Sequence, residues 1–267
     1  MTKEKAWRLI WSAACDGAMN MAVDEAILEE TVAGHSPPTL RLYRWEPPTL
    51  SLGYAQRAAD ADQAALQRLG WELVRRPTGG RAILHTDELT YSISAPETHP
   101  LVKGGVLESY RRLSLGLLAA LRLLGVEAVA GGERIRGGAH GAVCFETPSD
   151  YEITAGGRKL IGSAQARRLG GVLQHGTLPL TGDIARILRA LAQPEPSPES
   201  VRARAATLQE AAERLVSWEE AAEAVGQGFT QEFGLTFEKS RLSKREVERA
   251  AELARIKYGS DAWTLRV

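Results

Sequence analysis

The sequence predicts an α/β fold, in which a β-sheet domain flanked by helices extends to about residue 193 and a helical C-terminal tail packs on it. Three observations predict this class. Hydrophobic patterns of period two alternate with helical patterns along the first part of the chain. Helical patterns dominate from Asp183 onward. The 267 residues are enough for one large α/β domain or two small ones.

The first helix is expected to begin after Asp16, which has the position of an N-cap, and to end near Gly34. One helical face is apolar, formed by Met19, Val23, Ala26 and Ile27. The acidic residues fall mostly elsewhere on the helix, at Asp24, Glu25, Glu29 and Glu30. Alternating residues at 40–42 and again at 50–52, with Pro47 and Pro48 between them, predict two strands joined by a turn.

The next elements follow from the same two periodicities. They are a helix over 60–69 that ends at Gly70, strands over 71–76 and 89–95, a long helix over 106–124 stopped by Gly125, and a short strand over 126–130. The glycine-rich segment 131–141 predicts a mobile loop. A hairpin is expected from 151–154 and 159–164, turning at 155–157, and a strand from 171–180.

The C-terminal part is expected to be helical. Residues 194–198 are rich in proline and predict a stiff connector. Ser217 with Glu220, and Ser243 with Glu246, have the spacing of capping boxes. The second of these should open a helix that ends near Gly259.

Composition excludes several classes of protein. Basic and acidic residues balance at 33 each and no basic run occurs, which argues against a nucleic-acid or membrane-surface partner. The two cysteines, Cys15 and Cys144, form no metal-binding pattern. The N-terminus lacks an apolar signal core, and no stretch has the length of a membrane span. We therefore expect a cytoplasmic protein with free thiols and no metal.

Cys144 and Lys159 form the first candidate site. Cys144 follows the glycine-rich loop, and Lys159 lies fifteen residues later on the predicted hairpin. A cysteine is often only a small buried residue and a hairpin lysine only a solvated one. If the two side chains meet, however, the ammonium lowers the cost of forming the thiolate and stabilises an oxyanion, as acyl transfer requires. Cys15 lies beside Asp16, whose charge opposes thiolate formation.

Arg75 to His85 contain the second candidate site. Gly79 and Gly80 in tandem permit backbone shapes that present N–H groups to an anion or an acyl carbonyl, and the flanking arginines favour phosphate. A tight turn between strands explains the same composition. The motif is neither of the standard nucleotide-binding glycine motifs.

Small residues and histidines complete the candidate set. The small residues Gly162, Ser163 and Ala164 allow close approach and suit the floor of a tunnel. His85 and His175 are interpreted first as hydrogen-bonded structural histidines, ahead of a catalytic role. No Ser-His-Asp triad is indicated.

Five ordered motifs, together with Met19-Asn20-Met21-Ala22-x-Asp24-Glu25, resemble those of a known family. They are Arg75-Arg76-x-Thr78-Gly79-Gly80-Arg81-Ala82-x-x-His85, Glu88-Leu89-Thr90-Tyr91-Ser92, Cys144-Phe145 with Pro148-Ser149-x-Tyr151-Glu152, Gly157-Arg158-Lys159-x-x-Gly162-Ser163-Ala164-Gln165, and Leu173-Gln174-His175-Gly176-Thr177. The chain resembles the biotin/lipoate protein ligase and transferase superfamily, and within it the octanoyl-[acyl carrier protein]:protein N-octanoyltransferases of the LipM type. The resemblance extends from about Asp16 to the C-terminus.

The resemblance implies a mixed sheet flanked by helices, with a catalytic domain over 16–239 and a helical extension over 240–267. Cys144 would take an octanoyl group from the phosphopantetheine thioester of acyl carrier protein, and Lys159 would activate it. The acceptor would be a lysine of glycine cleavage H protein or of an E2 lipoyl domain. No cofactor beyond the donor's phosphopantetheine is implied, and we expect a monomer. The implied substrate-binding residues are Arg76, Thr78, Gly79, Gly80, Arg81, His85, Gly162, Ser163, Ala164, His175 and Gly176.

Three alternatives remain open at this point. An ATP-dependent lipoate–protein ligase has the same fold, but such ligases typically have a third glycine where this chain has Arg81 and do not rely on a cysteine at the position of Cys144. An amidotransferase that takes octanoyl from H protein would use the same chemistry. A non-catalytic module that binds a lipoyl domain or an acyl carrier is the third, and the presence of both Cys144 and Lys159 argues against it.

Overall fold

The computed structural model of the chain describes residues 6–131, 152–193 and 196–267. Cys144 and nearly all of the predicted glycine-rich loop lie outside these ranges. The predictions made for them therefore stay predictions.

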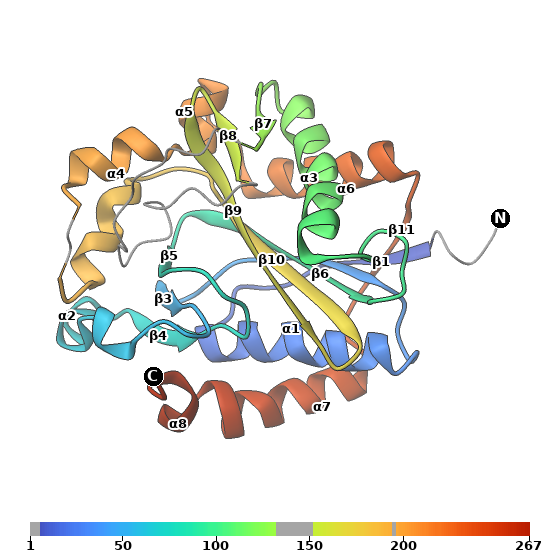
Figure 1. Cartoon of the computed structure of the whole chain (residues 1–267), viewed down its shortest axis with the longest axis horizontal. Coiled ribbons are helices and arrows are strands. Elements are labelled where there is room, and N and C mark those ends of the chain that lie inside the picture. The colour runs from blue at the N-terminus through green and yellow to red at the C-terminus, as the bar shows by residue number, and fades with distance from the viewer. Residues whose placement is uncertain (1–5, 132–151, 194–195) are drawn as a thin grey trace.

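A large mixed sheet forms the centre of the described part of the chain (Figure 1). Its strand order is β11-β1-β2-β6-β10-β9-β8-β7. The pairs β11–β1 and β1–β2 are parallel and the others are antiparallel, so the sheet is mixed, as the resemblance implied. The strands are β1 (Ala6–Trp11), β2 (Thr39–Tyr43), β6 (Glu88–Pro96), β7 (Val129–Ala130), β8 (Ile153–Ala155), β9 (Arg158–Arg168), β10 (Gly171–Pro179) and β11 (Thr236–Ser240).

A second, three-stranded sheet has the order β4-β3-β5, with β3 (Thr49–Leu52), β4 (Glu72–Arg75) and β5 (Ile83–His85). The two strands predicted around 40–42 and 50–52 exist as β2 and β3, but they belong to different sheets. Both edges of β2 are occupied by β1 and β6, so β3 pairs instead with β4 and β5. The small sheet packs over its own apolar cluster, which includes Leu50, Leu52 and Ile187.

Helices cover both faces of the large sheet (Figure 1). The α1 and α7 helices lie on one face, and α3 and α6 pack together on the other. The helices are α1 (Gly17–Val32), α2 (Gln63–Leu69), α3 (Val106–Leu123), α4 (Pro198–Arg204), α5 (Leu208–Ala212), α6 (Trp218–Phe233), α7 (Lys244–Leu253) and α8 (Asp261–Thr264). Short 3₁₀ segments cover Ala58–Asp60 and Ile184–Ala190, and a π-helical turn covers Ala254–Tyr258.

The α1 helix is buried on two sides, between the sheet and the C-terminal helices. Its N-cap is Asp16, as predicted, whose carboxylate accepts a hydrogen bond from the Met19 N–H at 2.7 Å. Asp24 and Glu25, which the sequence pattern places mostly off the apolar face, are also buried. Burial of these carboxylates is possible because Arg41 and Lys257 pair with them at 2.8 and 2.6 Å.

The C-terminal segment is more than a helical tail. It contributes β11 to the edge of the large sheet beside β1, and α6 packs on α3. Ion pairs then fix α7 and the π-helical turn to the rest of the fold: Arg8–Glu246, Arg249–Glu29 and Lys257–Glu25. A polar, mostly exposed strand such as β11 has no strong hydrophobic alternation, which explains why the sequence pattern does not indicate it. The boundaries of the predicted domains stay predictions.

Two capping boxes were predicted, and one is complete. Ser243 and Glu246 cap each other reciprocally at the start of α7. Ser217 caps α6 by accepting the Glu220 N–H, but the Glu220 carboxylate pairs with Arg214 instead of returning to the cap.

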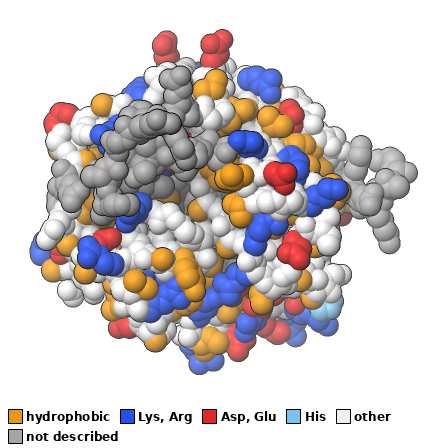
Figure 2. All heavy atoms as spheres, viewed as in Figure 1, with side chains coloured by type: hydrophobic (Ala, Val, Ile, Leu, Met, Phe, Trp, Pro, Cys, Tyr) orange, Lys and Arg blue, Asp and Glu red, His pale blue; other side chains and the backbone are white. Residues whose placement is uncertain are grey.

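The surface on the face seen in Figure 1 mixes charge and apolar area. Figure 2 shows Lys and Arg side chains interspersed with hydrophobic ones across the middle and lower part of this face. Among the helices of the described ranges, none is long and apolar enough to span a membrane.

Candidate active site

A cavity lies between the large sheet and the small one. Part of its wall is apolar or aromatic, from Met21, Tyr43, Trp45 and Ile83. Many of the predicted site residues also line it, namely Arg76, Gly80, His85, Gly162, Ser163, Ala164, His175 and Gly176. Residues that are distant in the sequence and were selected from motifs thus line one cavity.

Arg76 holds the glycine loop that borders this cavity. One end of its guanidinium donates to the backbone oxygens of Gly79 and Arg81, both at 2.9 Å. The other end donates to the backbone and hydroxyl oxygens of Ser51, both at 2.8 Å. Gly80 has a φ of 91°, a conformation that favours glycine, which explains why this residue type is needed in the loop.

Arg75 has a similar structural role next to the loop. Its buried guanidinium donates to the backbone oxygens of Thr264 and Gly53, at 2.9 and 2.8 Å. Both arginines of the motif therefore organise backbone. The expectation that they favour phosphate finds no support in these contacts.

His85 lies in the cavity wall with both ring nitrogens engaged. The ring stacks on Trp45 with centroids 3.9 Å apart. Nδ1 lies 2.6 Å from a Glu88 carboxylate oxygen and therefore donates to it. Nε2 lies 2.7 Å from the Ser51 hydroxyl, which also accepts from Arg76. Both ring nitrogens are thus bonded within the protein, as expected of a structural histidine.

His175 is held in the same way from the other side of the cavity. Its Nδ1 donates to Asp24 at 3.4 Å, and its Nε2 accepts from the Thr78 hydroxyl at 2.6 Å. Burial lowers the pKa of His175, so the ring is neutral at neutral pH. Burial alone would raise the pKa of Asp24, but the Arg41 guanidinium and His175 lower it below its usual range. Thr78, predicted as substrate-binding, thus positions His175.

Lys159 lies beside the cavity rather than in solvent. The side chain is 4% exposed, and its Nζ forms an ion pair with Glu152 at 2.5 Å. It passes close to Gly162, where a β-carbon would lie 3.2 Å from Nζ. Gly162 lines the cavity, so the ammonium lies next to a lining residue, although Lys159 is not itself one. The interpretation of Lys159 as a solvated edge residue is wrong.

Glu152 is a site residue to which sequence reasoning gave no role. The only signal was its place in the motif Pro148-Ser149-x-Tyr151-Glu152. Its carboxylate holds Lys159, and its backbone oxygen accepts the Gly131 N–H at 3.2 Å. The two described ends of the chain on either side of residues 132–151 therefore meet next to Lys159. Cys144 belongs to that intervening stretch, outside the described residues.

Ser163 is bonded within a polar network behind the cavity. Its hydroxyl lies 2.6 Å from the Tyr91 hydroxyl, which also accepts from the Gln174 amide at 3.0 Å. Gln174 in turn accepts from the Gln165 amide at 2.9 Å. The wall formed by β9 and β10 is therefore rigid at the positions expected to contact an acyl chain.

Known proteins resemble this chain in sequence and in structure. A curated octanoyltransferase LipM of Carboxydothermus hydrogenoformans is 44% identical, over 98% of this chain and 99% of its own length. A crystal structure of lipoate-protein ligase A bound with ATP has a TM-score of 0.82 at 26% identity, covering 97% of this chain and 98% of that one.

A bipartite lipoate protein ligase of Thermoplasma acidophilum, studied with its E2 lipoyl domain, has a TM-score of 0.80 at 25% identity, covering 97% of this chain and 96% of that one. These similarities confirm the predicted fold. The model of the lipoyl protein ligase A/B catalytic domain matches residues 16–230. The chain therefore belongs to the family of lipoyl protein ligase A/B catalytic domains.

Proposed function

We propose that this octanoyltransferase takes its acyl group from octanoyl-acyl carrier protein and passes it, through a thioester on Cys144, to a lysine of a lipoyl domain or of glycine cleavage H protein. The octanoyltransferase class predicted from the motifs agrees with relatives of that name over nearly the full length of the chain. The observation that carries the mechanism is the buried Lys159 ammonium, which Glu152 holds at the wall of the cavity.

The chemistry has two balanced steps. The Cys144 thiolate attacks the thioester carbonyl of the donor; a new C–S bond forms, and the phosphopantetheine sulfur leaves as a thiol after taking up a proton. The acceptor amine then attacks the acyl-cysteine; a C–N bond forms, the cysteine C–S bond breaks, and the amine loses a proton. Exchange of one thioester for another is nearly balanced, and amide formation from a thioester is downhill. The proposed reaction therefore needs neither ATP nor a metal.

Lys159 is suited to assist both steps. Its positive charge is held in a buried setting, where electrostatic interactions are stronger than in water. An ammonium beside the reacting carbon stabilises the cysteine thiolate before attack and the oxyanion during it. The carboxylate of Glu152 forms an ion pair with this ammonium at 2.5 Å and so fixes its position.

The cavity is proposed to hold the octanoyl chain. Its aromatic and aliphatic residues, with the small residues Gly162 to Ala164, provide apolar surface for an alkyl chain. Gly79, Gly80 and Arg81 form the loop at its border, which we propose contacts the donor arm or the acyl group. His85 and His175 are proposed to shape the wall, because their ring nitrogens are already bonded within the protein.

Intact-mass spectrometry tests the covalent intermediate. After incubation with octanoyl-acyl carrier protein, the protein should gain the mass of one octanoyl group less the displaced hydrogen. Cys15→Ala is the matched control because Cys15 is the other cysteine of the chain and lies at the start of α1. Wild type and Cys15→Ala should carry the adduct, and Cys144→Ala should not. A wild-type protein that stays unmodified by an active donor would favour a non-catalytic binding module.

An ATP-dependent ligase is the main alternative, since a ligase bound with ATP has a similar structure. The contacts of Arg75 and Arg76 argue against it, because both guanidinium groups bond backbone oxygens. The test supplies free octanoate, ATP and an acceptor domain. Efficient product formation that survives Cys144→Ala would overturn the transferase mechanism.

The donor and the acceptor are tested separately. Acyl carrier protein and octanoylated H protein are each supplied as the only donor, and transfer from the second alone would make the chain an amidotransferase. A lipoyl domain is proposed as acceptor because the similar ligase of Thermoplasma acidophilum was studied with its E2 lipoyl domain. Product on the lysine of that class of domain, identified by peptide mass spectrometry, is the expected outcome.

A further inference from the structure

Thr177 on β10 has a buried hydroxyl with no use in the fold. The residue is 1% exposed, and within the part of the chain that the structure describes its Oγ1 has no hydrogen-bond partner. Buried hydroxyl groups nearly always have one, and leaving one unpaired lowers the stability of the folded state. Because Thr177 also lines the acyl cavity, its hydroxyl is a candidate to bond a ligand there.

The position of Thr177 places it beside the proposed catalytic amine. Thr177 pairs directly with Gly162 across β9 and β10. Side chains of such a pair share one face, with β-carbons about 5 Å apart. A β-carbon at Gly162 would lie 3.2 Å from the Lys159 Nζ. The Thr177 hydroxyl and the Lys159 ammonium thus face the same side of the sheet, both next to Gly162.

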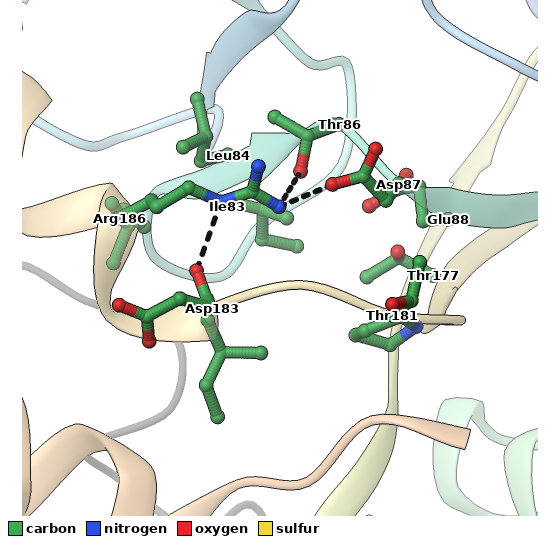
Figure 3. A pocket seen from close by; sticks show the side chains of 12 residues that line it. Ile83, Leu84, Thr86, Asp87, Glu88, Thr177, Thr181, Asp183 and Arg186 are labelled. Atoms are coloured by element: carbon green, nitrogen blue, oxygen red, sulfur yellow. Dashed lines mark hydrogen bonds and ion pairs between the residues drawn. The ribbon is translucent and has the colours of Figure 1, made fainter. Parts of the chain in front are cut away.

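Thr177 also forms part of the wall of a second cavity (Figure 3). Arg186 is already bonded there: it donates to the Thr86 hydroxyl at 3.1 Å, to the Asp87 carboxylate at 2.5 Å and to the Asp183 backbone oxygen at 3.0 Å. None of the bonds drawn in Figure 3 reaches Thr177. The acyl cavity, whose wall also includes Thr177, is the other space from which a partner for its hydroxyl can come.

We propose that the Thr177 hydroxyl donates a hydrogen bond to the carbonyl oxygen of the acyl group bound in the cavity, beside the Lys159 ammonium. This inference rests on the proposed acyl transfer. As a nucleophile attacks the carbonyl carbon, negative charge develops on that oxygen and the bond strengthens. Thr177 is then a catalytic residue for both half-reactions, because each passes through such an oxyanion.

The substitution Thr177→Val replaces the hydroxyl by a methyl group of similar size. It therefore distinguishes an effect on the transfer rate from an effect on the stability of the fold. Thr177→Val should lower kcat for transfer by about tenfold to a hundredfold with little change in KM, since the strongest bond is made in the transition state. Its melting temperature should stay equal or rise, because no protein bond is lost. Thr177→Ser, which keeps the hydroxyl, should transfer octanoyl at a rate close to wild type.

Thr31→Val is the matched control. Thr31 is likewise buried on α1 with an unpaired hydroxyl, and it does not line the acyl cavity. It should show the same effect on melting temperature and no effect on transfer. If valine at 177 prevents folding, Thr177→Ser and Thr177→Ala differ by the oxygen alone and give the same comparison.

The experiment follows both half-reactions by single-turnover mass spectrometry with octanoyl-acyl carrier protein and an acceptor domain. Equal transfer by wild type and Thr177→Val would show that the hydroxyl binds only water, and would overturn this inference while leaving the octanoyltransferase mechanism intact. The same holds if Thr177→Val melts at a markedly lower temperature and loses activity in proportion. Failure of the wild type to form any adduct would instead count against the proposed function.

Discussion

The amine-bearing end of Lys159 lies against the backbone of Gly162. A β-carbon on Gly162 would be 2.9 Å from Lys159 Cε and 3.2 Å from its Nζ, closer than side chains normally approach. The absence of a side chain at 162 therefore lets the ammonium reach the cavity wall. Both residues belong to β9, and Glu152 fixes the amine from the neighbouring chain segment.

Gly162→Ala should slow octanoyl transfer by roughly a hundredfold, because displacing a catalytic group by about 1 Å has effects of that size. The added methyl group pushes the Lys159 amine away from the cavity while the backbone stays in its normal conformation. The measurement is the single-turnover rate of acylation. Gly226→Ala is the control, since a β-carbon there meets only Leu9 Cδ2 at an ordinary 3.5 Å. Equal acylation rates for Gly162→Ala and wild type would show that the position of Lys159 does not matter to the reaction.

Glu152→Gln should slow acylation. The amide has nearly the size of the carboxylate but cannot form an ion pair with the Lys159 ammonium, so the amine is positioned less firmly. The single-turnover rate of acylation should fall by about tenfold or more. Glu210→Gln is the control because it neutralises an exposed carboxylate paired with the neighbouring Arg158, and its rate should match wild type.

A double-mutant cycle tests whether Glu152 and Lys159 act as one unit. Lys159→Met alone leaves a buried carboxylate without its cation and should reduce stability by about 3–5 kcal/mol. The double variant Lys159→Met, Glu152→Gln should recover much of the lost unfolding free energy. Urea denaturation measures this quantity for each variant. In the Lys159→Met background, Glu152→Gln should have no further effect on the acylation rate. Independent, additive effects on the rate would contradict the coupling.

Much of the fold could be predicted from local signals. Asp16 and Gly70 mark helix ends, and both form the expected caps. The hairpin of β8 and β9 turns at Gly156 and Gly157, whose positive φ values explain why glycines occur there. These signals were sufficient because each depends on the chemistry of a few neighbouring residues.

The unpredicted features depend on long-range pairing. Glu25 falls outside the apolar face that the pattern indicates for α1, yet it is buried, because Lys257 and Tyr258 bond to it from the far end of the chain. In the same way, β11 becomes a strand only because β1 offers a free edge. The candidate residues that line the cavity were selected by family motifs, while the Lys159 contact with Glu152 needed the coordinates.

Arg76→Lys should loosen the glycine loop. A lysine presents a single ammonium and cannot bond Gly79, Arg81 and Ser51 in the planar arrangement of the guanidinium. We expect a stability loss of at least about 1.5 kcal/mol, with a transfer rate reduced by about tenfold or more. Differential scanning calorimetry and steady-state kinetics measure the two effects.

Arg81→Ala provides the contrast within the same loop. Only the backbone oxygen of Arg81 holds the loop, so removal of its side chain should leave the melting temperature unchanged. A loss of transfer in that variant would therefore reflect contact with the donor. If Arg76→Lys kept both the stability and the rate of wild type, the guanidinium would not be what orders the loop.

Protonation of His175 should make the fold sensitive to mild acid. Burial lowers the pKa of His175 in the folded state below its ordinary value near 6.5. Between these two values the unfolded chain binds a proton that the folded chain does not, so stability rises with pH and falls as the medium is acidified. Arg41 and His175 lower the pKa of Asp24 despite its burial. Protonation of Asp24 therefore reduces the stability of the fold further at more acid pH.

His175→Gln should remove the first part of this dependence. From pH 6.5 downward, wild type should lose up to about 1.4 kcal/mol of unfolding free energy per pH unit more than the variant does, the limit for one proton. Urea denaturation at a series of pH values gives the two slopes, and only their difference matters because glutamine also changes the contacts to Thr78 and Asp24. Parallel curves for wild type and His175→Gln would mean that folding does not lower the pKa of the buried ring, and the predicted acid sensitivity would then need another cause.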